Sequence, residues 1–329
     1  MADGHLPATL LRDRHGRVKH KLRLSLTDRC NFRCRYCMPE TPDWIPKQQF
    51  LSRAELLQLA GQFVRMGIRN IRLTGGEPLL RPDLAGIIAD LDTLRPLGLE
   101  RISMTTNGSR LAEALPRLHA AGLDDLNISL DSVDPDRFRQ LTGAELAPVL
   151  AGIEAAQRLG VPFKLNTVLV RGHNEDDVLP LTAWAMQRGA PLRFIEYMPL
   201  DAPGQWQADR VVPEADILAT LRSRHLVEPQ PRGSDPATIY RIDGRYPLGI
   251  ISTVSNPFCS TCDRLRLTVR GELYTCLFAR QGTDLAGLLR NDPALLAQRI
   301  ADAVWVKEAG YAAHRAPVER PITMHTLGG

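Results

Sequence analysis

Short β-rich runs alternate with amphipathic helical runs between about residues 21 and 198, and no other feature limits the possible folds so strongly. Strands separated by helices pair in parallel, because each helix carries the chain back along the sheet. Six strands are predicted, at 22–27, 70–74, 101–105, 125–130, 164–170 and 192–198. The predicted helices lie at 52–67, 83–94, 111–121, 148–159 and 175–187. We therefore expect an α/β fold built on a parallel sheet.

The first predicted helix carries clear end signals. Ser52 and Glu55 have the spacing of a capping box, which satisfies backbone N–H groups at a helix start. Gly67 follows the last apolar position, and glycine suits the left-handed conformation in which helices commonly end.

The loops at the ends of these strands are polar and small. DRCNFRCRYC follows the first strand, GGEP the second and TNG the third, while SLDS and EYMP lie at the fourth and sixth. The carboxyl ends of parallel strands form the ligand-binding edge of such folds. Loops from six strands surround one site most easily when the sheet curls. We therefore prefer a partial (βα)6 barrel over a flat doubly wound sheet.

The pattern changes after about residue 200. A loop is predicted at 201–207 and a helix at 213–222, followed by a Pro- and Gly-rich stretch. Short strands are predicted at 238–242, 249–253, 265–269 and 272–275. We expect a basic N-terminal tail at 1–20, the barrel at 21–210, and a smaller C-terminal mixed α/β domain at 211–329.

Composition excludes several classes of protein. No apolar stretch approaches the roughly 18 residues that span a bilayer, so we expect no membrane association and a cytoplasmic location. Six Lys/Arg and two Asp lie in residues 1–23, which leaves the remaining chain with balanced charge. A balanced body argues against nucleic-acid binding. We expect the basic N-terminus to be a solvated, frayed tail.

The six cysteines fall into two groups, which in a reducing compartment indicates metal ligands or redox centres. Cys30, Cys34 and Cys37 have the spacing C-x3-C-x2-C directly after the first strand. Such a loop can place three thiolates on a 4Fe-4S cluster and leave one iron without a protein ligand. A structural zinc site would need a fourth Cys or His, and residues 29–45 supply none.

RCNFRCRYC, with Tyr36 before the third cysteine, resembles the signature of the radical S-adenosylmethionine (SAM) superfamily. GGEP at 75–78 follows the second strand, where that superfamily binds the amino group of SAM; alone, it would indicate a glycine-rich turn. The resemblance implies that the open iron chelates the methionine part of SAM. Electron transfer from the cluster would then generate a 5′-deoxyadenosyl radical that removes hydrogen from substrate.

Cys259, Cys262 and Cys276 have the spacing C-x2-C-x13-C. On spacing alone, a second 4Fe-4S cluster and a zinc ribbon completed by a distant His fit equally well. The first cluster in the same chain favours a second one. Arg264 and Arg266 would point to the same face of a strand and suit a polyanion such as a triphosphate, with a solvent-facing basic strand as the alternative.

Together these motifs resemble the molybdenum cofactor biosynthesis protein A family, the GTP 3′,8-cyclases. The likeness runs from Leu22 to Gly329 and includes MTTNG, LNISLDS and RFIEYMP. It implies a lyase with two 4Fe-4S clusters and SAM, which forms 3′,8-cyclo-7,8-dihydro-GTP from GTP by hydrogen abstraction at C3′ and attack on guanine C8. This reaction is the first step of molybdenum cofactor biosynthesis. An external electron donor and the pterin synthase protein C would be its partners, and a homodimer is compatible with the sequence.

The resemblance also implies site residues, while no side chain is given a catalytic role, because the cofactor generates the radical. The expected SAM contacts are Tyr36, Gly76, Ser129 and Met198. The expected GTP contacts are Arg23, Arg72, Thr105, Lys164, Arg264 and Arg266. Of these, Arg23, Arg72 and Lys164 are expected on consecutive strands as a cationic ring for the phosphates. A terminal Gly-Gly is commonly frayed, but Gly328 and Gly329 would here enter the barrel mouth.

Two other functions compete with this interpretation. Another radical SAM enzyme, such as a peptide-modifying maturase, usually carries more C-terminal cysteines and a groove for peptide in place of paired arginines. A zinc-ribbon module for nucleic acid would leave both GGEP and the first cysteine loop unexplained.

Overall fold

The chain is described by a computed structural model over residues 10–39, 41–200, 206–233, 235–311 and 324–328. Its centre is a parallel sheet of six strands. They are β1 (Lys21–Ser25), β2 (Asn70–Thr74), β3 (Arg101–Thr106), β4 (Asp125–Ser129), β5 (Phe163–Leu169) and β6 (Leu192–Glu196). The helices beside it are α1 (Arg53–Arg65), α2 (Leu84–Asp92), α3 (Leu111–Ala120), α4 (Pro135–Thr142), α5 (Ala147–Arg158) and α6 (Val178–Gln187).

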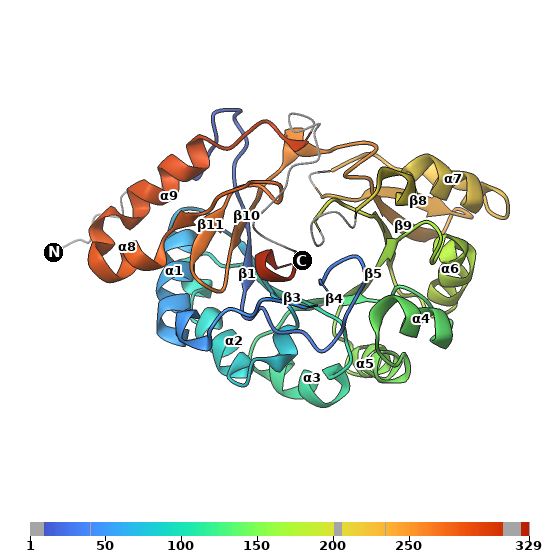
Figure 1. The fold of residues 1–329 in the computed structure, drawn as a ribbon, viewed down its shortest axis with the longest axis horizontal. Helices are drawn as coiled ribbons and strands as arrows, with labels where there is room; N and C mark the ends of the chain where they lie inside the picture. Colours follow the sequence, from blue (N-terminus) through green and yellow to red (C-terminus); the bar gives the residue numbers. More distant parts are fainter. Residues whose placement is uncertain (1–9, 40, 201–205, 234, 312–323, 329) are drawn as a thin grey trace.

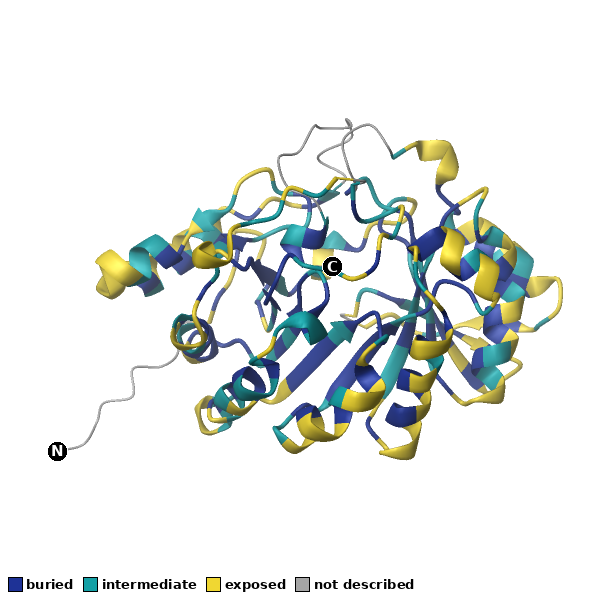
Figure 2. Cartoon of the chain, turned by 60° about the horizontal axis from the view of Figure 1, so that its bottom comes forward, coloured by how far each residue is buried: buried dark blue, intermediate teal, exposed yellow. Residues whose placement is uncertain are grey.

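Figure 1 shows the sheet curled, with α1 to α6 along its outer side and the C-terminal end of the chain in the hollow. This arrangement confirms the expected α/β fold with a partial barrel. Figure 2 shows the strands buried and the outward faces of the helices exposed.

The C-terminal strands extend this same sheet at both edges. They are β7 (Val227–Pro229), β8 (Thr238–Ile242), β9 (Tyr246–Ile251), β10 (Arg264–Leu267), β11 (Glu272–Tyr274) and β12 (Thr283–Asp284). The 12 strands have the order β12-β11-β10-β1-β2-β3-β4-β5-β6-β9-β8-β7. Because β10 pairs in parallel with β1, and β9 with β6, residues after 210 complete both sides of the hollow.

The strand pattern divides apolar from polar side chains across the sheet. Leu22, Ile71 and Ile102 are in register on β1, β2 and β3 and are fully buried. In the next row Arg23 and Arg72 are in register and line the hollow. Successive side chains of a strand point to opposite faces, so one alternation supplies both the core and the site.

Most predicted elements are confirmed, with ends that differ by at most three residues. Helix 175–187 begins with a 3-10 turn, Glu175–Asp177, before α6. Residues 201–205 of the predicted loop lie outside the described residues. Several short elements lie outside the predicted set: α4, β7, β12, α8 (Ala286–Asn291), α9 (Leu296–Trp305) and α10 (Met324–Leu327). The predicted helix 213–222 is α7 (Glu214–Arg222).

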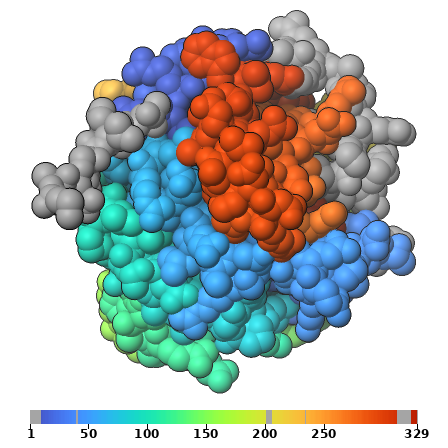
Figure 3. Space-filling view, turned by 90° about the vertical axis from the view of Figure 1, so that its left-hand side faces the viewer, coloured from blue at the N-terminus to red at the C-terminus, as the bar shows by residue number. Residues whose placement is uncertain are grey.

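The expectation of a frayed N-terminal tail is wrong for residues 10–20. Asp13 and Lys19 are almost completely buried, at 1% and 0% exposure. The backbone N–H of Arg14 donates to the Trp305 carbonyl at 3.1 Å, which ties this segment to α9. Figure 3 shows the blue N-terminal segment against the orange C-terminal helices. Residues 1–9 lie outside the described residues.

A search of the described helices finds none with the length and apolar character needed to cross a membrane.

The capping box of α1 gives a test of the fold. Ser52 Oγ accepts the Glu55 N–H at 3.3 Å, and the Glu55 carboxylate accepts the Ser52 N–H at 2.8 Å. We predict that Ser52→Ala lowers the free energy of unfolding by about 1 kcal/mol, because an N–H of the first turn loses its acceptor. Urea denaturation followed by circular dichroism measures the change. Ser52→Thr keeps a hydroxyl and should retain most of the stability; equal midpoints for the two variants would contradict the role of the cap.

Candidate active site

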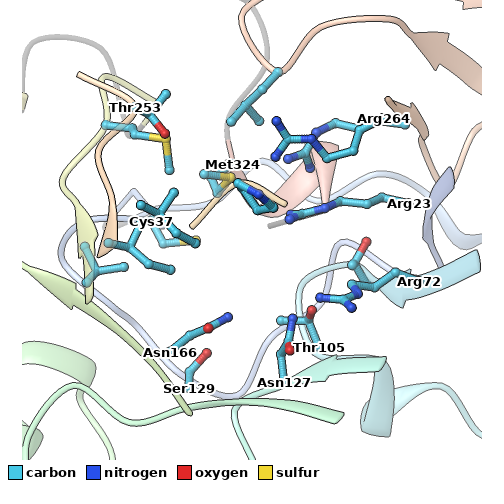
Figure 4. Close-up of a pocket in the computed structure, with 18 of the residues that line it drawn as sticks. Arg23, Cys37, Arg72, Thr105, Asn127, Ser129, Asn166, Thr253, Arg264 and Met324 are labelled. Atoms are coloured by element: carbon cyan, nitrogen blue, oxygen red, sulfur yellow. The ribbon is translucent and has the colours of Figure 1, made fainter. Parts of the chain in front are cut away.

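A cavity of about 380 Å³ occupies the concave side of the sheet. All six cysteines line it, as do all ten positions expected to contact SAM or GTP. Figure 4 shows Arg23, Arg72 and Arg264 on one side of this space, with Cys37 across from them. The fold therefore brings together residues that are up to 253 positions apart, from Arg23 to Cys276.

The first cysteine loop holds three half-buried cysteines, Cys30, Cys34 and Cys37. Burial raises the pKa of Cys30 to about 11 and that of Cys34 well above its usual value. Ionisation as a ligand therefore needs a bound cation. The Phe32 N–H points at the Cys30 sulfur, 3.4 Å away, which suits a thiolate acceptor. These three residues fit an iron-sulfur cluster.

The helix that the sequence analysis did not predict anchors this loop. The Arg33 N–H donates to the carbonyl of Thr142, the last residue of α4, at 2.8 Å. Phe32 packs edge-on against Phe138 of α4, with ring centroids 6.0 Å apart. Asp134 and Pro135 give α4 its start, and this Asp-Pro pair was the signal by which the helix could have been found.

The GGEP turn lies against the backbone that leads into Cys30. A Cβ on Gly75, whose φ is +146°, would lie 2.4 Å from the Thr27 carbonyl oxygen. A Cβ on Gly76 would lie 2.2 Å from the Arg29 carbonyl oxygen. The Gly76 N–H donates to Thr27 O at 2.7 Å. Both glycines are needed for this close approach, so the turn places its backbone beside the first cysteine loop.

Glu77 of this turn joins the loops after β2 and β3. Its carboxylate accepts the Thr106 hydroxyl and the Asn107 N–H, each at 2.7 Å, and the Leu79 N–H at 3.0 Å. Burial raises the pKa of Glu77 to about 7, against the effect of these donors. We assign this residue a structural role in the wall of the cavity.

Asp131, within SLDS, was not among the expected site residues. Its carboxylate accepts the Tyr36 hydroxyl at 2.6 Å and the Val168 N–H at 2.9 Å. Burial raises the pKa of Asp131 to about 6. The aspartate thus fixes Tyr36 relative to Ser129 at the end of β4. Its position in a polar motif at a strand end was the signal that marked it.

Three arginines lie side by side on β10, β1 and β2. Arg23 is in register with Arg266 on one side and with Arg72 on the other. Burial, together with repulsion from these neighbours, lowers the pKa of Arg23, and burial with repulsion from Arg264 lowers that of Arg266 to about 10. Within the described ranges, none of Arg23, Arg264 and Arg266 forms an ion pair with a carboxylate. Buried positive charge without counter-ions fits a polyanionic ligand.

The expectation that Arg23, Arg72 and Lys164 occupy consecutive strands is wrong. Arg23 and Arg72 are neighbours, but Lys164 lies on β5, beyond β3 and β4, and is in register with Asn127. It reaches the same cavity because the sheet curls. The cations therefore face the cavity from two sides.

Charged residues that the sequence analysis did not select complete this end of the cavity. Arg193, on β6, lines it beside Lys164. Asp125 pairs with Arg101 at 2.8 Å, and Asp235 pairs with Lys21 at 3.1 Å. Only the folded structure brings these side chains together, from strands and from the loop before β8.

Each sulfur of the second cysteine loop accepts a hydrogen bond. Cys259 accepts from Tyr311 N at 3.3 Å, Cys262 from Arg264 Nη2 at 3.6 Å, and Cys276 from Phe278 N at 3.4 Å. Burial opposes ionisation of Cys262, but Arg264 and Lys307 outweigh it and lower its pKa to about 7. In the described part of the chain, no three Cys, His, Asp or Glu side chains converge on a point that would suit a single metal ion. Donors at all three sulfurs fit thiolates that bind a larger cluster.

The C-terminal end enters the cavity beside β10. Arg266 donates a hydrogen bond to the Gly328 carbonyl. Gly328 has a φ of +78°, and a Cβ there would lie 2.2 Å from Thr74 Oγ1. This position therefore requires glycine. Gly329 lies outside the described residues.

Two family models and full-length relatives match the chain. The Radical SAM superfamily model matches residues 24–185, and the Molybdenum Cofactor Synthesis C model matches residues 190–313. A GTP 3′,8-cyclase of Mycobacterium sp. (strain KMS) is 45% identical over 327 residues, covering 96% of this chain and 93% of its own. One from Corynebacterium glutamicum (strain R) is 44% identical over 329 residues, covering 94% of this chain and 87% of its own.

Solved structures share the fold at low sequence identity. Streptococcus suis SuiB bound to S-adenosylmethionine has a TM-score of 0.56 and 14% identity, covering 87% of this chain and 69% of SuiB. SuiB bound to the precursor peptide SuiA has a TM-score of 0.59 and 13% identity, covering 87% of this chain and 68% of SuiB. Those likenesses show the fold alone, whereas the family models and full-length relatives identify the family. The chain belongs to the GTP 3′,8-cyclase family of the radical SAM superfamily.

Proposed function

We propose that this chain performs the reaction for which its relatives are named, the conversion of GTP to 3′,8-cyclo-7,8-dihydro-GTP, at the start of molybdenum cofactor biosynthesis. The observation that carries the proposal is the cavity itself. Two three-cysteine loops and a row of buried arginines line one space, so a radical source and a polyanionic nucleotide can meet there. The arginines also disfavour the peptide-modifying alternative.

We assign the SAM end of the cavity to Tyr36, Gly76, Ser129 and Met198, beside the cluster ligands Cys30, Cys34 and Cys37. When bound, the reduced cluster and SAM supply the radical that removes hydrogen from C3′ of GTP. The chain itself positions these groups. Gly76 keeps the backbone of its turn close to the first cysteine loop, and Asp131 holds the Tyr36 ring through its hydroxyl.

We assign the GTP end to Arg23, Arg72, Thr105, Lys164, Arg264 and Arg266, with Cys259, Cys262 and Cys276 holding a second 4Fe-4S cluster for the guanine. Arginines fork toward phosphate oxygens and make paired charge-assisted hydrogen bonds. Anchoring at the phosphates fixes the ribose relative to SAM, and fixed geometry is the main contribution that a protein makes to radical chemistry. The C-terminal segment beside Arg266 helps to close the site.

The same assignment implies partners and a location. GTP is the substrate, an external donor supplies electrons, and the pterin synthase protein C takes up the product. The six cysteines fall in two three-cysteine loops, and we place the enzyme in the cytoplasm, where thiols stay reduced and available to ligate clusters.

The first cysteine loop gives the most direct test of the radical chemistry. Replacing Cys30, Cys34 or Cys37 with Ala should abolish 5′-deoxyadenosine formation, because the cluster loses a ligand and the loop holds no spare thiol. Iron content after anaerobic reconstitution should fall from about eight to about four per chain. Normal 5′-deoxyadenosine formation by any of these variants would overturn the assignment. Four irons with bound zinc in the unmodified chain would remove the second cluster.

Arginines on β10 give a test of nucleotide binding. We expect Arg264→Ala or Arg266→Ala to weaken GTP binding by about 1.5–3 kcal/mol, roughly tenfold to hundredfold, through loss of a charge-assisted hydrogen bond. Calorimetry measures the affinity, and SAM cleavage driven by reductant alone should persist. Arg270→Ala removes an exposed arginine just beyond the same strand and serves as the control. Equal GTP affinity in all three variants would return Arg264 and Arg266 to a purely structural role.

Removing Gly328 and Gly329 tests the C-terminal segment. Arg266 keeps its place on β10 and both cysteine loops stay intact, whereas the backbone that enters the cavity beside Arg266 is lost. We expect iron content and GTP binding to be preserved, whereas cyclisation and the substrate-dependent part of 5′-deoxyadenosine formation fall. Full cyclisation by the shortened chain would show that this segment has no part in turnover.

A further inference from the structure

A buried cluster of charges lies behind the second cysteine loop, in the segment before β1. Asp13 is its centre: its carboxylate accepts hydrogen bonds from His15 N and Arg17 N, from Arg17 Nε at 2.6 Å, and from Lys19 Nζ at 2.7 Å. Although burial opposes ionisation, the bonds from Lys19 and Arg17 lower the pKa of Asp13 to about 2. A buried ion pair costs desolvation energy, and further hydrogen bonds from Arg17 and Lys19 offset part of that cost.

Three further hydrogen bonds from Arg17 go to carbonyl groups around the first cysteine of the loop. Nη1 donates to Cys259 O at 2.8 Å and to Ala309 O at 2.6 Å, and Nη2 donates to Glu308 O at 2.6 Å. Arg17 is only 8% exposed. Its planar guanidinium therefore joins the cysteine loop to the segment after α9 in one fixed geometry.

That joined segment packs directly on the Cys259 side chain. A Cβ on Gly310 would lie 2.2 Å from the Cys259 Cβ, and the Tyr311 N–H donates to the Cys259 sulfur at 3.3 Å. Arg17 holds the carbonyls of Glu308 and Ala309, and so fixes the position of the Tyr311 N–H. Hydrogen bonds to ligating sulfurs are among the determinants of iron-sulfur reduction potentials.

Two lysines hold the other parts of the loop. Lys19 Nζ donates to Cys262 O at 2.8 Å, and Lys307 Nζ donates to the carbonyl of Thr275, the residue before Cys276. Both lysines are buried, at 0% and 3% exposure. Every cysteine of the second loop thus has a buried cation on its own carbonyl or on the adjacent one.

The charges of this cluster do not cancel among themselves. Arg17, Lys19 and Lys307 carry three positive charges against the single negative charge of Asp13. Three thiolates on the other side of the same backbone would supply the missing negative charge. The excess of positive charge therefore indicates a negatively charged group at the second cysteine loop.

We propose that Arg17 and Lys19, oriented by Asp13, are positioning residues for the second cluster, which hold the Cys259-to-Cys262 turn in its ligating shape and raise the reduction potential of the bound cluster. The inference rests on the proposed function only in requiring that this loop holds an iron-sulfur cluster. It gives the N-terminal segment a role at a site that lies more than 240 residues later in the chain.

The test uses the full chain in which Cys30, Cys34 and Cys37 are all replaced by Ala, so that only the second cluster reports. In this background Lys19→Met removes a cation and one carbonyl contact. We expect iron to be lost to a chelator about tenfold faster or more, and the reduction potential, followed by electron paramagnetic resonance, to become more negative. Lys19→Arg restores a cation and should return both values toward those of the background.

Arg17→Lys tests the effect of geometry separately from the effect of charge. The lysine keeps a positive charge near Asp13, but it cannot reach the three carbonyls that the planar guanidinium contacts. Iron loss should therefore accelerate, with a smaller shift of the reduction potential than in Lys19→Met. Arg14→Gln removes an exposed positive charge from the same turn and should change neither value. Circular dichroism of the apoprotein confirms folding, and Arg17→Lys decides the matter if Lys19→Met does not fold.

The outcomes separate this inference from the proposed function. The inference would be overturned if Lys19→Met and Arg17→Lys both bound about four irons and left the rate of iron loss and the reduction potential unchanged. The second cluster would still stand in that case. No bound iron in the background chain would overturn the second cluster, and the inference with it. Equal effects of Arg14→Gln and Lys19→Met would reduce the result to net charge and also overturn positioning.

Discussion

The parallel pairing of β1 with β2 on one side and β10 on the other is the constraint on which the rest of the site depends. Each strand alternates an apolar residue toward the helices with a polar residue toward the hollow. The register of the strands then aligns the apolar residues in one row and the polar residues in the next. Arg266, Arg23 and Arg72 become neighbours for the same reason that Leu265, Leu22 and Ile71 do, so the arginine row and the core are fixed by one set of hydrogen bonds.

That pairing also brings the second cysteine loop to the cavity that the first loop lines. Cys259 and Cys262 lie just before β10, and Cys276 follows β11, so insertion of β10 beside β1 places all three at the cavity. The row of arginines is costly without a ligand, because buried like charges repel one another and lose water. A bound triphosphate would relieve this cost.

Behind the second cysteine loop, a buried cluster of charges centred on Asp13 holds the backbone of that loop. It links the start of the chain, the turn between Cys259 and Cys262, and the end of α9 through side-chain contacts to carbonyl groups. The segment before β1 and the segment after α9 both contact the second cysteine loop, and neither contributes a cysteine to it.

Sequence alone determined what depends on neighbours along the chain. Strand and helix positions, the Ser52 cap, the glycines of GGEP and the spacing of both cysteine groups follow from local pattern and backbone sterics. Tertiary structure alone decided which strands pair. The order β10-β1-β2 put Arg266 beside Arg23, curvature brought Lys164 to the same cavity from β5, and burial turned a basic N-terminus into the support of a distant loop. Such contacts depend on register and burial, which no local pattern encodes, because the partners lie hundreds of residues apart.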